Sequence, residues 1–149
     1  MRPSCSLRTG AVFVLAFLFA AAPVMLTHAQ NSDYKQDPSW QAPYGAVARK
    51  NPLAENKSAV GGGAKLFQRH CVECHRADGT GLLAKKAANF TLDSVQAQSD
   101  GTLFWKITNG NADRGMPSFS QLPEGQRWQL VLFLRTLKAS TVDATPKVR

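Results

Sequence analysis

The sequence predicts a small all-α domain, for three reasons. Apolar residues recur at helical spacing in a short stretch from Val60 to Cys71 and in a longer one from Pro123 to Leu137. Proline is well tolerated in the first turn of a helix, so Pro123 is a typical start for the second stretch. No run of alternating strands is indicated anywhere in the chain. The protein is therefore expected to bury its core between helices.

The segments between these two helices are shorter and less regular. Residues 76–81 (RADGTG) predict a turn-rich loop, and residues 91–98 predict a weak helical turn. Residues 100–107 (DGTLFWKI) fit one face of a helix, but their aromatic residues suit a strand as well, so both structures stay open there. The sequence Asn-Gly-Asn at 109–111 ends this segment.

The N-terminus has the features of a secretory signal peptide over residues 1–29. Arg2 and Arg8 precede an uncharged apolar run, residues 11–26, and small residues follow at the positions that a signal peptidase reads, with the cut expected after Ala29. A retained membrane anchor is the alternative, but the run is shorter than the ~20 residues needed to span a bilayer. Cleavage predicts a periplasmic protein with no further contact to the membrane.

The chain that remains after cleavage forms one small domain with two flanking segments. Residues 30–58, the N-terminal extension, show neither the helical nor the strand periodicity of apolar residues, and they hold three prolines. The extension is expected either to lie over the domain through Trp40 and Tyr44 or to act as a spacer. Residues 59–138 are the predicted domain, and residues 139–149 are a tail that is expected to fray.

Cysteine and histidine gather in one five-residue motif, Cys71-Val72-Glu73-Cys74-His75. Two thiols three positions apart near the end of a helix can each bond to one vinyl group of a haem, and the next histidine then lies under the iron. This is the attachment pattern of a c-type haem. Export agrees with it, because haem is attached to such chains outside the cytoplasm. The sequence therefore predicts one haem c, covalently held by Cys71 and Cys74, with His75 as an iron ligand.

Three other interpretations of the motif are weaker. A thioredoxin-like dithiol uses the same spacing but lies in a βαβ unit, which this helical chain lacks. Zinc needs four ligands, and those on offer are crowded into the six residues from His70 to His75. A surface disulfide leaves His75 without a role.

Met116 is the predicted second iron ligand. It is the only methionine beyond the signal peptide, and it lies between Gly115 and Pro117. A lone methionine usually fills a gap in a core, but a glycine and a proline beside it indicate a rigid loop that suits a thioether ligand. The other available ligand, His70, directly precedes the cysteine motif and cannot easily reach the opposite face of the haem.

From Gly63 to Leu137 the chain resembles a class I cytochrome c, the family of small monohaem electron carriers. In that family a glycine, an aromatic residue and the first haem cysteine follow at four-residue steps, as Gly63, Phe67 and Cys71 do here. The last helix crosses the first with an aromatic residue against the glycine, and Phe133 is the matching residue. The resemblance implies a class I cytochrome c fold: short helices wrapped around one covalently bound haem, with the N- and C-terminal helices crossing.

Two further expectations follow from the resemblance. Trp105 is similar to the family tryptophan that lies along the haem edge and bonds a propionate through its ring nitrogen, with plain core packing as the alternative. Many family members carry a proline after the motif, whose carbonyl accepts a hydrogen bond from the proximal histidine. No proline occurs here between His75 and Met116, so the sequence does not identify the acceptor; a backbone carbonyl near residues 81–83 is one candidate.

Two protein ligands leave no iron position for a small-molecule substrate, so the predicted function is single-electron transfer between redox proteins, without catalysis. One alternative is a cytochrome subunit permanently bound to an exported dehydrogenase or oxidase. Another is a haem peroxidase or gas-binding protein, for which no spare distal histidine remains. The apolar residues expected to line the haem pocket are Leu66, Phe67, Leu82, Leu83, Phe90, Ile107 and Phe119.

The charge balance indicates acidic partners and not nucleic acid. Removal of the signal peptide takes away two arginines and leaves 16 Lys and Arg against 10 Asp and Glu, a net charge of +6. The bases are scattered, and no nucleic-acid recognition motif accompanies them. Some of them flank the cysteine motif, as a solvated surface or as a positive collar that steers acidic redox partners. These bases are Lys65, Arg69, Arg76, Lys85 and Lys86.

Overall fold

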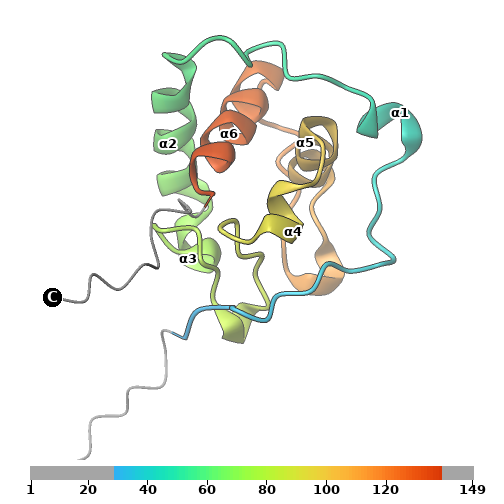
Figure 1. Cartoon of the computed structure of the whole chain (residues 1–149), viewed down its shortest axis with the longest axis vertical. Helices are drawn as coiled ribbons and strands as arrows, with labels where there is room; N and C mark the ends of the chain where they lie inside the picture. The colour runs from blue at the N-terminus through green and yellow to red at the C-terminus, as the bar shows by residue number, and fades with distance from the viewer. Residues whose placement is uncertain (1–28, 139–149) are drawn as a thin grey trace, which may run out of the picture.

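The computed structural model describes residues 29–138 and shows an all-α domain (Figure 1). Residues 1–28 of the predicted signal peptide and the predicted tail, residues 139–149, lie outside the described residues. No strand occurs in the described part, where two isolated bridges join Gln30 to Leu82 and Asn111 to Met116. The helices are α1 (Tyr44–Val47), α2 (Ala59–His70), α3 (Val72–His75), η1 (Leu83–Lys85), α4 (Asp93–Gln96), α5 (Asp100–Asn109), η2 (Ala112–Arg114) and α6 (Glu124–Thr136). The all-α prediction is confirmed.

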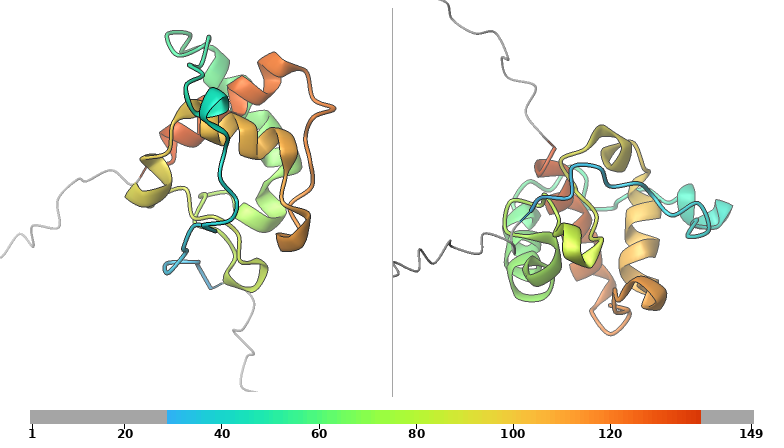
Figure 2. Two further views of the ribbon diagram at one scale, coloured as in Figure 1. Left: turned by 90° about the vertical axis from the view of Figure 1, so that its right-hand side faces the viewer. Right: turned by 90° about the horizontal axis from the view of Figure 1, so that it is seen from below.

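Helices α2 and α6 lie side by side and pack against each other (Figures 1 and 2). Gly63 is their point of closest approach, because a Cβ atom there would lie 2.0 Å from the carbonyl oxygen of Gln129 and 2.9 Å from the Cβ of Phe133. The ring of Phe133 then packs on that of Phe67, with centroids 5.1 Å apart. The predicted crossing of a glycine with an aromatic residue is confirmed.

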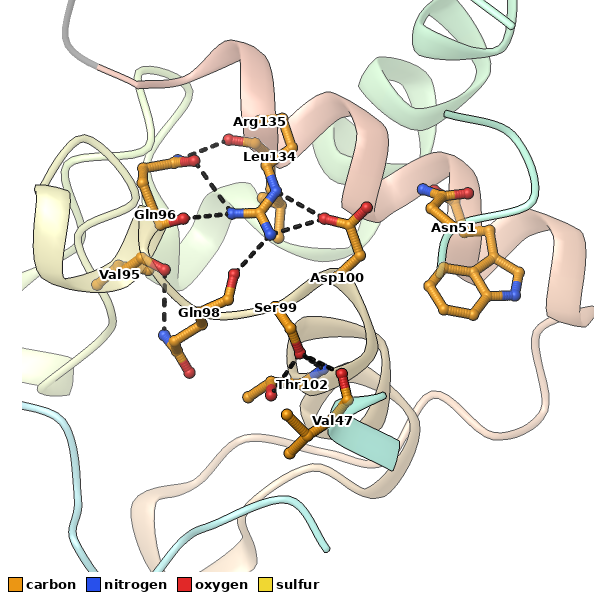
Figure 3. Close-up of polar contacts among 11 residues, drawn as sticks. Val47, Asn51, Val95, Gln96, Gln98, Ser99, Asp100, Thr102, Leu134 and Arg135 are labelled. Carbon is orange, nitrogen blue, oxygen red and sulfur yellow. Dashed lines mark hydrogen bonds and ion pairs between the residues drawn. The ribbon is translucent and has the colours of Figure 1, made fainter. Parts of the chain in front are cut away.

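The segment that fits both helix and strand in the sequence is helical and forms α5. Ser99 precedes the helix, and its hydroxyl accepts a hydrogen bond from the amide of Thr102 at 3.1 Å (Figure 3). The same hydroxyl donates to the carbonyl of Val47 at 2.8 Å, which joins the start of α5 to the end of α1. A side-chain cap of this kind favours a helix start. The apolar residues of α5 that enter the core are Leu103, Phe104 and Ile107.

Arg135 of α6 ties the turn between α4 and α5 to the last helix (Figure 3). Its guanidinium pairs with the carboxylate of Asp100 at 2.6 Å and donates to the backbone carbonyls of Gln96 and Gln98, each at 2.6 Å. The planar guanidinium offers five N–H groups in fixed directions, so one arginine can hold several acceptors at once. This contact fixes the position of α5, which supplies one wall of the site described below.

The N-terminal extension lies over the domain (Figures 1 and 2). Two buried asparagines anchor it. The Asn31 amide donates to the carbonyl of Ala87 at 2.7 Å, and the Asn51 amide donates to the carbonyl of Trp128 at 3.1 Å. Since a buried polar group is costly unless it is hydrogen-bonded, these pairs fix the extension in one position.

One ion pair and one aromatic residue add to this attachment. Asp37 of the extension pairs with Arg114, in η2, at 3.0 Å. Of the two aromatic residues expected to hold the extension, Trp40 is half-buried, whereas Tyr44 is 89% exposed and does not anchor it. None of the helices in residues 29–138 is long and apolar enough to cross a membrane.

Candidate haem-binding site

Cys71 and Cys74 lie at the junction of α2 and α3. The amide of Cys71 still donates to the carbonyl of Phe67 in α2, at 2.8 Å, and the amide of His75 donates to the carbonyl of Cys71, also at 2.8 Å. The chain therefore continues in helical turns through the motif, which brings all three side chains to one side. Both cysteines are free and half-buried, and both line the same cleft.

The environment of Cys71 does not support a redox-active dithiol. Burial, and to a lesser degree the neighbouring Cys74, raises the pKa of the Cys71 thiol to about 12. Cysteines that act as nucleophiles or redox centres have a lowered pKa, because the thiolate is the reactive form. The zinc interpretation gains no support either, since within residues 29–138 no three His, Cys, Asp or Glu side chains gather as a metal site.

His75 is oriented by one backbone hydrogen bond. Its Nδ1 atom lies 3.0 Å from the carbonyl oxygen of Ala88. A carbonyl oxygen only accepts, so Nδ1 carries the hydrogen and Nε2 keeps the lone pair that a metal requires. Burial lowers the pKa of His75, and the hydrogen bond to Ala88 opposes that shift in part. The imidazole is thus held neutral, in the tautomer that suits an iron ligand at Nε2.

The acceptor that the sequence left unidentified is the carbonyl of Ala88 and not one near residues 81–83, because the chain turns back and places Ala88 against the histidine. The amide of Phe90 donates to the carbonyl of Gly79 at 2.8 Å, which closes this reversal. Every residue carries a carbonyl oxygen, so no side chain in the sequence indicates which of them the histidine contacts. His75 thus has a backbone acceptor although no proline follows the motif.

Met116 is presented by a closed turn. Asn111 and Met116 exchange both backbone hydrogen bonds, at 2.8 and 2.9 Å. Gly110 adopts a φ of 66° and lies so close to the next segment that a Cβ atom would be 2.5 Å from the carbonyl of Pro117. Only glycine fits both demands. The turn holds Met116 in the wall of the cleft.

One cleft therefore brings together Cys71, Cys74, His75 and Met116, although Met116 lies far from the motif in sequence. The space between the lining atoms is about 1120 Å³, a figure that includes the open mouth of the cleft. His70 also lines it. The predicted pocket residues that line the cleft are Phe90, Ile107 and Phe119.

The other predicted pocket residues lie behind the cleft or away from it. Phe67 is buried, with its ring 6.5 Å from that of His75 and 6.1 Å from that of Phe90, so it supports the wall from the core. Leu66 packs against the same core, and Leu83 is 52% exposed. Of the basic residues expected to form a positive collar, Lys85 and Lys86 border the cleft, while Lys65 and Arg69 are exposed on α2.

Trp105, expected along the haem edge, does not line the cleft. It borders a second cavity, together with Arg49 and Arg127. Its neighbour Lys106 lines the main cleft, and successive residues of a helix point about 100° apart, so Trp105 faces a different side of α5. The tryptophan in the cleft wall is Trp40, from the N-terminal extension.

Among the cleft side chains that sequence reasoning missed are Tyr34, Trp40 and Lys106. Tyr34 and Trp40 belong to a segment without periodicity, so only their aromatic character marked them. Lys106 follows Trp105 in a predominantly apolar helix, where a lysine is unusual. This was the one available signal.

These residues fit a covalently bound haem: two free thiols, an imidazole with an available nitrogen, a thioether and an apolar wall. The fold and the site together define a class I c-type cytochrome. The family model described as cytochrome c oxidase, cbb3-type, subunit III matches residues 58–134, and the chain belongs to this family. Its cofactor is haem c with iron, covalently bound, and it is a haem-based electron-transfer protein.

Among solved structures, one described as "KustC0563 c-type cytochrome" is 30% identical in sequence to this chain. The match covers 51% of this chain and 96% of that one, with a TM-score of 0.47. No curated protein matches the chain.

Proposed function

We propose that this protein is an exported monohaem cytochrome that carries single electrons between redox proteins through a haem ligated by His75 and Met116. One observation carries the proposal: the cysteine motif and Met116, from distant parts of the sequence, line the same cleft. When bound, the haem supplies an iron that alternates between the ferric and ferrous states and so holds one electron at a time. Cys71 and Cys74 are the proposed attachment points.

The proposed ligands differ in how they are held. The hydrogen bond from His75 to Ala88 orients the imidazole and raises its basicity as a ligand. The turn around Met116 is fixed by its paired hydrogen bonds with Asn111, so little rearrangement accompanies ligation. With both axial positions taken by protein, the chain would exclude a substrate from the metal. This arrangement supports electron transfer over catalysis.

Partner binding is proposed at the open mouth of the cleft. Lys85 and Lys86 are exposed and line the cleft, so they place positive charge beside the route by which electrons enter or leave. Exposed charges of one sign steer an oppositely charged partner and speed its encounter without strengthening the final complex much. Redox proteins with acidic docking surfaces are the partners that this surface fits.

A second candidate is a cytochrome subunit permanently bound to an oxidase or dehydrogenase. It is favoured by the family description, which names a subunit of a cbb3-type cytochrome c oxidase. The free carrier should purify as a monomer from the soluble periplasmic fraction. The bound subunit should co-purify with a larger enzyme, so size-exclusion chromatography of the native extract separates the two candidates.

Covalent attachment tests the proposal directly. Haem should stay on the wild-type chain through acid–acetone extraction and in a denaturing gel, because thioether bonds survive both treatments. Double substitution of Cys71 and Cys74 by alanine should release it, whereas His70→Ala, which alters a neighbouring cleft residue, should not. Haem that washes out of the wild-type chain, or a Cys71–Cys74 disulfide in its mass spectrum, would refute the proposed attachment.

A further inference from the structure

Lys106 is a buried lysine in the wall of the cleft. It belongs to α5, and only 6% of its surface is exposed to solvent. It lines the cleft together with Met116 and Trp40. Its ammonium group donates to the side-chain oxygen of Gln98 at 2.7 Å and lies 4.7 Å from the centre of the Trp40 ring. Lysine is almost never fully buried unless its charge is paired.

These two contacts do not neutralise the charge of Lys106. An ammonium group has three donors, and a neutral amide oxygen and an aromatic face supply only partial compensation for its lost hydration. Within residues 29–138, no carboxylate lies within ion-pair distance of its nitrogen. The carboxylate that influences it most, Asp37, is paired with Arg114 at 3.0 Å.

Burial lowers the pKa of Lys106, Asp37 raises it, and the positive charge of Arg114 lowers it again. The electrostatic environment in the described residues therefore leaves this ammonium short of negative charge. A cleft wall with an under-compensated buried cation is suited to an anionic group of the molecule that fills the cleft. A haem has two such groups, its propionate carboxylates.

The N-terminal extension completes this part of the cleft. Trp40 covers the ammonium of Lys106, and Tyr34 lines the cleft from the same segment. Both residues precede the region that the family model matches, residues 58–134. The salt bridge from Asp37 to Arg114 attaches this segment to the turn that carries Met116. The extension and α5 therefore form one wall, which the matched domain alone does not provide.

We propose that Lys106, covered by Trp40 of the N-terminal extension, is the binding group for one haem propionate. The proposal rests on the proposed function, since it requires a haem in the cleft. It makes the extension a constituent of the cofactor site. Lys106 would hold the carboxylate in an ion pair shielded from water, and its positive charge would favour the ferrous over the ferric iron.

Two charge-removing variants of the haem-loaded protein test the proposal. Lys106→Met keeps an unbranched side chain only one atom shorter and removes the cation, and Lys65→Met does the same at an exposed site on α2 that does not line the cleft. The measurements are the reduction potential and the redox-difference infrared bands of the propionates. Lys106→Met should lower the potential by several times the shift of Lys65→Met and displace a propionate band. Lys106→Arg should restore both.

The outcomes separate this proposal from the proposed function. If Lys106→Met and Lys65→Met shift the potential equally and leave the propionate bands unchanged, the propionate assignment is wrong, while the haem remains attached. Trp40→Leu gives a second test should Lys106→Met fold poorly. It should displace the same band, and an unchanged band would contradict the proposal.

Discussion

Gly63 sets the distance between α2 and α6, because its missing side chain leaves room for the carbonyl of Gln129. The close approach also brings Phe133 onto Phe67, and the ring of Phe67 lies 6.5 Å from that of His75. A single glycine thereby connects the packing of the core to the position of a proposed iron ligand.

Gly63→Ala should destabilise the haem-loaded protein. The new Cβ would lie 2.0 Å from a backbone carbonyl, so the two helices must move apart, at a cost of about 1–3 kcal/mol in the free energy of unfolding. Gly61→Ala is the matched control in the same helix, because nothing lies within 4 Å of its added Cβ. It should be neutral or stabilising by up to about 1 kcal/mol. Equal denaturant midpoints for the two variants would contradict the packing described here.

Asn51 shows how one buried side chain attaches the extension. Asn51→Ala leaves the carbonyl of Trp128 without this donor and should lower the free energy of unfolding by about 1–3 kcal/mol. Asn56→Ala removes the same amide from an exposed position and should change stability by less than about 0.5 kcal/mol. Urea unfolding of both variants measures the difference. No loss in Asn51→Ala would mean that the extension is not anchored there.

At the scale of secondary structure, Arg135 links three elements. Its guanidinium joins the turn between α4 and α5 to α6 through the Asp100 carboxylate and the carbonyls of Gln96 and Gln98 (Figure 3). The residues involved are only partly exposed, 28% for the arginine side chain and 29% for Asp100. Contacts of this kind exceed ordinary surface ion pairs in strength, because several acceptors share one rigid donor group.

Arg135→Lys should therefore destabilise the fold even though the charge is kept. A lysine ammonium lacks the planar fork that matches these acceptors in fixed directions, so the loss is expected to be about 2 kcal/mol in the free energy of unfolding. Lys138→Met provides the control at the same end of α6. Its pair with Asp93 is 3.5 Å long and exposed, and its removal should cost less than about 0.5 kcal/mol. Thermal unfolding that ranks Lys138→Met as the more damaging variant would argue against this role of Arg135.

The elements also show which features a sequence can reveal. The helix crossing was predictable because a glycine and two aromatic residues at fixed spacing are required wherever two backbones approach this closely. Residues 100–107 were ambiguous because their pattern of apolar residues fits both a helix and a strand. Packing against α6 and the Ser99 cap favour the helix. The extension could not be placed, because its anchors are single polar side chains that bond to distant backbone carbonyls.

The site likewise has residues that the sequence predicts and residues that it does not. The cysteine motif and Met116 were predictable from the sequence, since thiols, imidazole and thioether are the groups that attach a haem and bind its iron. The carbonyl of Ala88 and the cleft position of Trp40 depend on chain reversals that no local pattern marks. Trp105 was assigned by resemblance to a family position, and the structure places Trp40 in the cleft wall in its stead.

At the scale of the whole molecule, export and haem attachment are expected to occur together. The native protein should have the mass of a chain that begins at Gln30 plus one haem, because cleavage is predicted after Ala29 and the motif binds a single group. Intact-mass spectrometry of the periplasmic fraction measures both. A chain that still begins at Met1 would make residues 11–26 a membrane anchor and place the protein at the membrane.

The choice between electron carrier and haem enzyme depends on the second axial ligand. A peroxidase or gas-binding protein needs an open iron position, whereas Met116 held by its closed turn would fill that position. Pro117→Ala should loosen this turn and weaken ligation without abolishing it, since proline mainly restricts the alternatives open to the chain. The strength of the sulfur-to-iron band, described next, measures the effect, and a band of wild-type strength would mean that Pro117 does not stiffen the turn.

The optical spectrum of the ferric protein tests the central claim most directly. If the sulfur of Met116 binds iron, the wild-type spectrum should contain the weak long-wavelength band of sulfur-to-iron charge transfer. Met116→Ala should abolish this band and lower the reduction potential, because thioether ligation favours the ferrous state. A wild-type spectrum without the band, unchanged by Met116→Ala, would contradict the account: Met116 would then be a core residue, and the iron would be open to substrates.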